Sequence, residues 1–201
     1  MTESQEIQDS LEFVNWLIRE GGLQLMKHER IRELARGGII GCMCADGDYS
    51  LLLEMKLKEV NPRQHLLKLN GGGFLLGLDP NSGFDAATKE YLHAAQVVLK
   101  WDLTEAFHQL KKGTTVLMIA HGIHCGKAHK LEVSLSDMLL ATMRADEVVT
   151  AHLEVSEDVV LPVFLMDWTP GEKGILKKKV KLYVVKKKAG LLIKRWFDRN
   201  R

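Results

Sequence analysis

Apolar residues recur at spacings of three and four over residues 4–20, which predicts an amphipathic helix. The stretch 23–36 has a second helical pattern, and a pair of glycines follows each segment, as at helix ends that close with a left-handed residue. The next apolar run, residues 39–44, is short, continuous and bounded by turn signals, which is typical of a strand buried on both faces. The pattern therefore predicts an N-terminal helical arm over residues 1–36 that leads into a buried strand.

The rest of the chain alternates strand patterns with helical ones, apart from residues 49–60, which fit a helix or a strand equally well. This order predicts an α/β domain with a mainly parallel central sheet, flanked by helices and ending in a C-terminal hairpin. The expected helices cover 85–111 and about 134–145, and the expected strands cover 65–69, 114–120, 159–167 and 177–185.

Composition places the chain among globular proteins. Of its 201 residues, 46% are apolar and 27% charged, so one domain with a buried core is expected over residues 1–201. No apolar run approaches the roughly 18 to 20 residues that span a bilayer, and the acidic, polar N-terminus lacks the pattern of a secretory leader. Three cysteines cannot form a closed disulfide set. We therefore expect a cytoplasmic protein without a membrane span.

The small net charge of +2 hides a strong asymmetry along the chain. Residues 177–201 carry 11 lysines and arginines and one acid, whereas the other 176 residues carry 17 bases and 25 acids. We expect a basic C-terminal strand and tail over 177–201. Such an end is either a solvated surface or a binding surface for an anionic partner, because its field attracts phosphates and anionic lipids.

Two cysteines and a histidine follow two different predicted strands. Cys44 ends the strand at 39–44, and His121 and Cys125 follow the strand at 114–120. Because ligands gather where parallel strands end, these side chains can share one site. Zinc prefers thiolate and imidazole ligands in a tetrahedron, so residues 37–176 are expected to form a metal-binding core, with Asp46 and His124 as supporting groups or a fourth ligand. The alternative is that the cysteines only fill the core.

Glycine and tryptophan positions predict structure more than chemistry. Gly71, Gly72 and Gly73 indicate a turn or a close backbone approach beside the site, because no Lys-Ser/Thr follows them as in a phosphate-binding loop. Trp16, Trp101 and Trp196 lie in segments of helical pattern, and we expect them to pack rather than to stack on a ligand.

The two strand ends resemble signature motifs of the beta-class carbonic anhydrases. The stretch GIIGCMCADGD, residues 38–48, resembles a strand that enters Cys-x-Asp-x-Arg, and VLMIAHGIHCG, residues 116–126, resembles a strand that enters Gly-His-x-x-Cys-Gly. Between them, LKLNGGG at 67–73 looks like the family's strand and Arg-Asn-Ala-Gly turn, and residues 163–174 resemble its last hairpin. The likeness runs in order over about residues 35–185.

This resemblance implies a zinc ion held by Cys44, His121 and Cys125, with water or Asp46 in the fourth position. It implies the reversible hydration of carbon dioxide to bicarbonate, a lyase reaction in which zinc lowers the pKa of bound water to about 7 and the hydroxide attacks the carbon. Asp46 would be the catalytic aspartate, which accepts a hydrogen bond from that hydroxide or caps the metal. The family forms dimers, so a homodimer is implied.

The chain departs from the family motifs at two positions. Asp48 stands where the family has an arginine that pairs with its aspartate, and two neighbouring carboxylates repel each other, so Asp46 can ligate zinc directly. His121 and Cys125 are four residues apart where the family has three, so His124 is the substitute ligand if His121 does not reach the metal.

The sequence leaves three alternatives to this lyase open. The first is a hydrolase of a carbon dioxide analogue. The second is a noncatalytic protein of the same fold that binds an anionic partner through its basic end. The third is thiol catalysis by Cys125 with His121 or His124, since a cysteine near a helix N-terminus has a lowered pKa.

Overall fold

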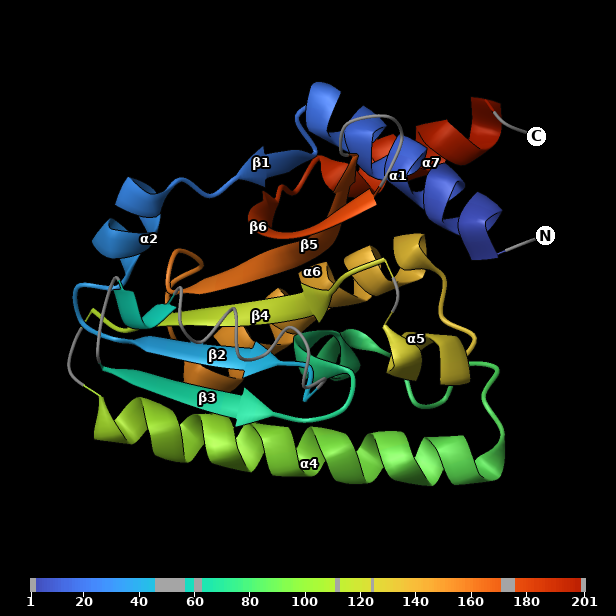
Figure 1. Cartoon of the computed structure of the whole chain (residues 1–201). Coiled ribbons are helices and arrows are strands. Elements are labelled where there is room, and N and C mark those ends of the chain that lie inside the picture. Colours follow the sequence, from blue (N-terminus) through green and yellow to red (C-terminus); the bar gives the residue numbers. More distant parts are fainter. Residues whose placement is uncertain are drawn as a thin grey trace.

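The computed structural model describes residues 3–45, 57–59, 63–110, 113–123, 125–170 and 176–199. A six-stranded sheet with the order β1-β6-β5-β4-β2-β3 forms its centre, and helices lie on both sides (Figure 1). The strands are β1 (Leu23–Leu25), β2 (Ile39–Met43), β3 (Gln64–Lys68), β4 (Thr115–His121), β5 (Val160–Pro170) and β6 (Leu176–Val185). The helices are α1 (Glu3–Arg19), α2 (His28–Leu34), the 3-10 helix η1 (Gly72–Gly77), α4 (Ala86–Gln109), α5 (Gly126–Lys130), α6 (Leu135–Leu153) and α7 (Ala189–Arg199).

Most of the sheet is parallel, as the sequence predicts. Strands β3, β2, β4 and β5 pair in parallel, and β5 turns back antiparallel onto β6, which pairs antiparallel with β1. All residues of β2 and β4 are buried, which confirms the prediction that the apolar run at 39–44 forms a strand covered on both faces. Because β2 and β4 are parallel neighbours, their carboxyl ends reach the same edge of the sheet.

Alternate residues of β4 face two different hydrophobic clusters, because successive side chains of a strand point to opposite faces. Val116, Met118 and Ala120 belong to the larger cluster, which also takes in buried side chains of α1, α4, α6 and α7. Leu117 and Ile119 belong to the smaller cluster, which includes side chains of α2. Helix α6, predicted over 134–145, begins after its cap Ser134 and continues to Leu153.

The prediction of a helix over 23–36 is wrong for its first residues. Leu23–Leu25 form β1, which pairs with Tyr183, Val184 and Val185 of β6, and only His28–Leu34 are helical. Strand β1 pairs with the backbone groups that β6 presents on the side away from β5. This long-range pairing overrides a helical spacing that the local sequence favours.

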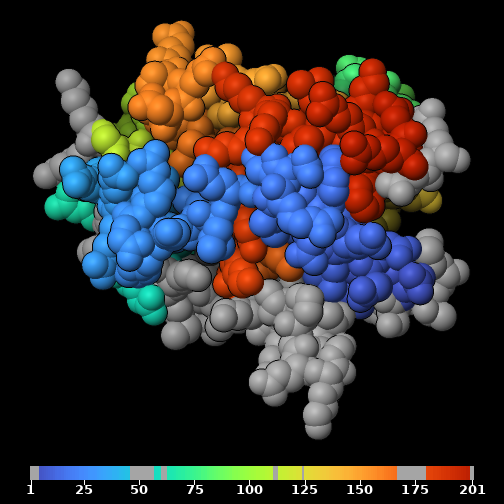
Figure 2. Space-filling view, turned by 90° about the horizontal axis from the view of Figure 1, so that it is seen from above, coloured from blue at the N-terminus to red at the C-terminus, as the bar shows by residue number. Residues whose placement is uncertain are grey.

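The basic C-terminal segment is a strand followed by a helix, not a strand and tail. Helix α7 packs on α1, with the ring centroids of Trp16 and Trp196 5.1 Å apart and those of Phe13 and Trp196 5.5 Å apart. Figure 2 shows α1 and α7 side by side on one face. Packing is thus confirmed for Trp16 and Trp196, but the prediction is wrong for Trp101, which is 69% exposed on α4. Among the described residues, no helix is long and apolar enough to cross a membrane.

Asp146 on α6 links the stability of the fold to pH. Burial raises the pKa of its carboxyl to about 6, a hydrogen bond from the Thr150 hydroxyl opposes the rise, and the charge of Glu147 adds to it. The folded state therefore holds the proton more tightly than the unfolded chain. Ionisation of Asp146 then costs stability, and this cost grows as the pH rises through the interval between the ordinary carboxyl pKa and that of the folded state.

We expect Asp146→Asn to raise the free energy of unfolding by about 1–2 kcal/mol at pH 7.5, about half of what the pKa shift alone gives because the side chain is partly exposed. At about pH 4.5 the gain should shrink to about a third, because the folded carboxyl is then almost fully protonated and the pH lies only a little above the ordinary carboxyl pKa of 3.8. Urea unfolding at both pH values measures this. The exposed neighbour gives the control, since Glu147→Gln should change stability by less than about 0.5 kcal/mol. An equal gain in the free energy of unfolding from Asp146→Asn at both pH values would contradict a raised pKa of Asp146.

Candidate metal centre

The structure brings together the three residues that the sequence places after two strands. Cys44 directly follows β2, His121 is the last residue of β4, and Cys125 is the N-cap of α5. Their candidate ligand atoms all lie within 4.8 Å of one another. The side chains are 7%, 2% and 3% exposed, respectively. The group arises because two parallel neighbouring strands, β2 and β4, end at one edge of the sheet, and Cys125 caps the helix that follows β4.

The donor set is suited to a transition metal. Two thiols and one imidazole offer the soft and borderline ligands that such ions prefer, whereas calcium and magnesium favour oxygen. The three buried side chains could therefore hold a metal ion. A thiol must lose its proton to become a ligand, so metal binding at this group releases protons.

Backbone groups of the glycine run hold Cys44 in place. The amide N–H of Gly71 donates a hydrogen bond to Cys44 Sγ at 3.3 Å. Gly72 adopts a φ of +67°, and a Cβ atom there would lie 2.5 Å from the backbone nitrogen of Cys44. Only glycine allows this approach. The run at 71–73 is thus both a turn and a backbone approach beside the group, the two structures that the sequence indicates.

The thiols of the two candidate ligands, Cys44 and Cys125, contact each other. The pKa of the Cys125 thiol is raised, chiefly by a hydrogen bond with the Cys44 side chain and then by burial, while the backbone N–H groups of Ala128 and Lys127 act in the opposite direction. A bound cation would reverse this balance, because coordination deprotonates a thiol. The third cysteine differs, since Cys42 lies in the larger hydrophobic cluster and burial raises its pKa to about 12.

Tyr91 and Lys127 contact each other beside the cysteines. The Tyr91 hydroxyl donates a hydrogen bond to the carbonyl oxygen of Asn70 at 3.2 Å, and Lys127 Nζ lies 3.4 Å from the centroid of the Tyr91 ring. Burial raises the pKa of Tyr91, and the nearby charge of Cys44 adds to this rise. The pKa of Lys127 is lowered, first by burial and then by the charge of Lys130. Lys127 lies two residues after Cys125, whereas long-range packing brings Tyr91 of α4 to the site.

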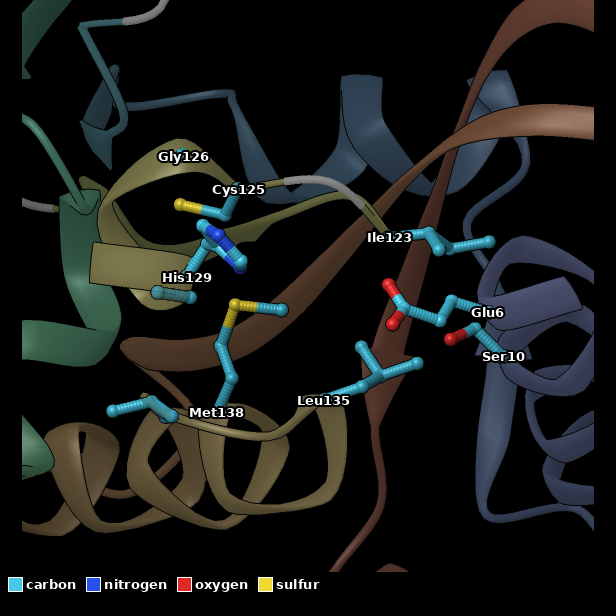
Figure 3. Close-up of a pocket in the computed structure, with 10 residues that line it drawn as sticks. Glu6, Ser10, Ile123, Cys125, Gly126, His129, Leu135 and Met138 are labelled. Carbon is cyan, nitrogen blue, oxygen red and sulfur yellow. The ribbon is translucent and has the colours of Figure 1, made fainter. Parts of the chain in front are cut away.

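A cavity of about 480 Å³, which we call the chamber, lies against Cys125. Figure 3 shows Glu6 and Ser10 of α1 on the side opposite Cys125 and His129. Its volume is within the range of small-molecule sites. The remaining lining is mostly apolar and consists of Ile123, Gly126, Ala128, Val133, Leu135 and Met138.

Three residues named from the sequence lie outside the described residues. These are Asp46, proposed as the catalytic aspartate or fourth ligand, Asp48, and the substitute ligand His124. Their parts in the site stay predictions. For the described residues, His121 is the histidine that lies with the two cysteines.

Comparison with known proteins does not show a family for this chain. No protein-family model matches the chain, and no curated protein or solved structure matches it significantly. The residues and motifs at the ends of β2 and β4 therefore carry the indications of activity.

Proposed function

We propose that Cys44, His121 and Cys125 bind a zinc ion and that the protein is a zinc-dependent lyase that hydrates carbon dioxide reversibly, as the beta-class carbonic anhydrases do. One observation carries this proposal: two thiols and one imidazole, all buried, have their ligand atoms within 4.8 Å of one another. A three-residue set of this kind matches catalytic zinc sites, which leave the fourth position to water or substrate.

The topology supports the likeness to that family. The two stretches that resemble its signatures end β2 and β4, which are parallel neighbours, and the glycine run follows β3 on the other side of β2. Motifs that are 77 residues apart in the chain therefore meet at one edge of the sheet, as a shared metal site requires. We propose on this ground that the fold is of the carbonic anhydrase type.

Zinc in such a set supplies a nucleophile from water near neutral pH and polarises the substrate. The chain provides the ligands and fixes their positions. The Gly71 amide donates to Cys44 Sγ, which stabilises the thiolate form of this ligand. Burial of Cys44, His121 and Cys125 removes bulk water from their side chains, and the chamber beside Cys125 offers space through which a small molecule approaches.

Stopped-flow measurement of carbon dioxide hydration tests the proposal. We expect the zinc-loaded chain to accelerate hydration, with a rate that rises with pH. Cys44→Ser should lower the rate by at least about 100-fold, because the loss of a metal ligand costs more activity than the loss of a residue that only hydrogen-bonds to a ligand. Cys42→Ala is the matched control, since it removes a thiol two residues away that does not belong to the ligand group. A zinc-loaded chain that hydrates carbon dioxide no faster than buffer would overturn the lyase. Turnover of carbonyl sulfide by that same chain would instead assign it to the hydrolases of carbon dioxide analogues.

A further inference from the structure

Helix α7 presents a surface that the proposed metal centre does not use. Its inner side, with Ala189, Leu192 and Ile193, is buried against the rest of the chain. On its outer side, Leu191 is 68% exposed and Phe197 is 45% exposed. Figure 2 shows α7 beside α1 on one face of the molecule. Two large apolar side chains therefore stand in solvent on a helix of 11 residues.

Cations border these apolar side chains. Lys194 and Arg195 lie three and four residues after Leu191, so both flank it on the helix surface. Lys188 directly precedes α7, and all three basic side chains are exposed. Lys187 is set apart from them, because it forms an ion pair with Glu157 at 2.6 Å. The α7 surface, as we call it, consists of Lys188, Leu191, Lys194, Arg195 and Phe197.

The acids of the neighbouring helix lie away from the start of α7. Lys188 Nζ lies against the turn that follows α1, where Arg19 and Glu20 offset each other in charge. At the other end of α7, the ring centroids of Phe197 and Phe13 are 6.3 Å apart. The acids of α1 precede Phe13 in the chain and are Glu3, Glu6, Asp9 and Glu12. The cations at the start of α7 therefore keep a positive field toward solvent.

We propose that the α7 surface binds an anionic lipid bilayer, with α7 lying in the plane of the bilayer surface. Leu191 and Phe197 enter the boundary between headgroups and acyl chains, and the cations contact lipid phosphates. The methylene stems of Lys194 and Arg195 lie along this boundary while their charged ends stay in water. At 11 residues α7 is about 16 Å long, which suits a position in the surface and is too short to cross the hydrocarbon core.

A bilayer fits this surface better than a purely polar polyanion does. A nucleic acid or an acidic protein segment neutralises the cations but leaves Leu191 without an apolar partner, whereas an anionic bilayer takes up both kinds of side chain. The surface is also preformed, because Trp196 packs on Trp16 with ring centroids 5.1 Å apart, so binding carries no cost of folding the helix. None of these observations involves the metal centre, and the proposal is independent of the lyase.

Co-sedimentation of the full chain with vesicles tests the proposal. At about 50 mM salt, vesicles of phosphatidylcholine with about 30% phosphatidylglycerol should bind the chain at least about tenfold more tightly than phosphatidylcholine alone, because each cation near an anionic surface adds about fivefold. At about 0.5 M salt this difference should largely disappear, since the screening length falls to a few ångströms.

An apolar substitution tests insertion into the bilayer. Leu191→Gln leaves the charge unchanged and should weaken binding to the anionic vesicles by at least about threefold, because it removes an apolar side chain from the boundary. Val97→Gln is the matched control, since Val97 on α4 is also 68% exposed but lies outside the α7 surface.

A charge substitution tests the contact with phosphates. Lys194→Gln combined with Arg195→Gln should weaken binding by at least about tenfold. Lys27→Gln combined with Arg32→Gln is the control, because it removes two exposed cations that lie near and within α2. Circular dichroism establishes that each variant is folded.

Three outcomes would overturn the proposal. The first is a chain that binds neutral and anionic vesicles equally, or neither of them at low salt. The second is binding to anionic vesicles that Leu191→Gln leaves unchanged, since the contact is then purely electrostatic. The third is binding to a single-stranded DNA of about 20 nucleotides but not to the vesicles, which would make the basic end a nucleic-acid surface.

Discussion

Protein purified without added zinc is expected to contain about one metal ion per chain, and Cys125→Ser to contain less than about a tenth of that amount. Cys125 supplies one of only two sulfurs in the ligand group, and its side chain also contacts that of Cys44. A serine hydroxyl remains protonated where the thiol would ionise, so the remaining cysteine and histidine hold the ion weakly. Elemental mass spectrometry of untagged protein, with sulfur as the internal standard, measures the ratio.

The control for this experiment is Cys42→Ala, which should keep the full metal content. Cys42 is completely buried and lies outside the ligand group. Its removal deletes one small side chain from the core, so stability is expected to fall by about 1 kcal/mol while the sheet edge is unchanged. Metal retained in Cys125→Ser, or absent from wild type even after incubation with zinc, would rule out the centre.

The largest effect on stability is expected from Gly77→Ala. Gly77 ends η1 where it packs directly against α6, and a Cβ atom there would overlap the carbonyl group of Ala141 and lie 2.7 Å from the backbone nitrogen of Ala145. Backbone atoms of a buried helix cannot move aside as a flexible side chain can. We expect a loss of more than about 4 kcal/mol in the free energy of unfolding, which is enough to leave little folded protein.

Gly83→Ala provides the comparison, because it makes the same chemical change at a site where no atom lies within 4 Å of the added Cβ. Its effect on the free energy of unfolding should stay within about 0.5 kcal/mol. Urea unfolding and the yield of soluble protein report both variants. If Gly77→Ala unfolds like Gly83→Ala, η1 does not pack on α6 as closely as described.

The sheet could be predicted from the sequence because its central strands are marked locally. Buried strands such as β2 and β4 are continuous apolar runs, and Gly113 marks the break between α4 and β4. Residues 23–25 and the C-terminal helix carry no such mark. Leu23 takes its conformation from pairing with Val185, and α7 is stabilised by packing of Trp196 against α1, so both depend on contacts remote in the chain.

The candidate ligands could be predicted for a different reason. Cys44, His121 and Cys125 follow strand patterns, and parallel strands bring their ends together whatever the intervening loops do. Tyr91 is different, because its place beside the cysteines depends on how α4 packs against α5 at the sheet edge. No spacing in the sequence encodes that packing. Trp101 shows the same limit, since a helical pattern alone does not reveal which side of α4 meets the sheet.

The distance along the chain between the candidate ligands has a consequence for when a metal ion could bind. Cys44 and Cys125 are 81 residues apart, and they meet only after β2 has paired with β4. An ion bound there closes a long loop, so it acts as a cross-link that restricts the unfolded chain. A nascent chain that has not reached Cys125 lacks the last candidate ligand. Metal loading would therefore be a late step of maturation, and a bound ion would stabilise a sheet that the chain must first assemble without it.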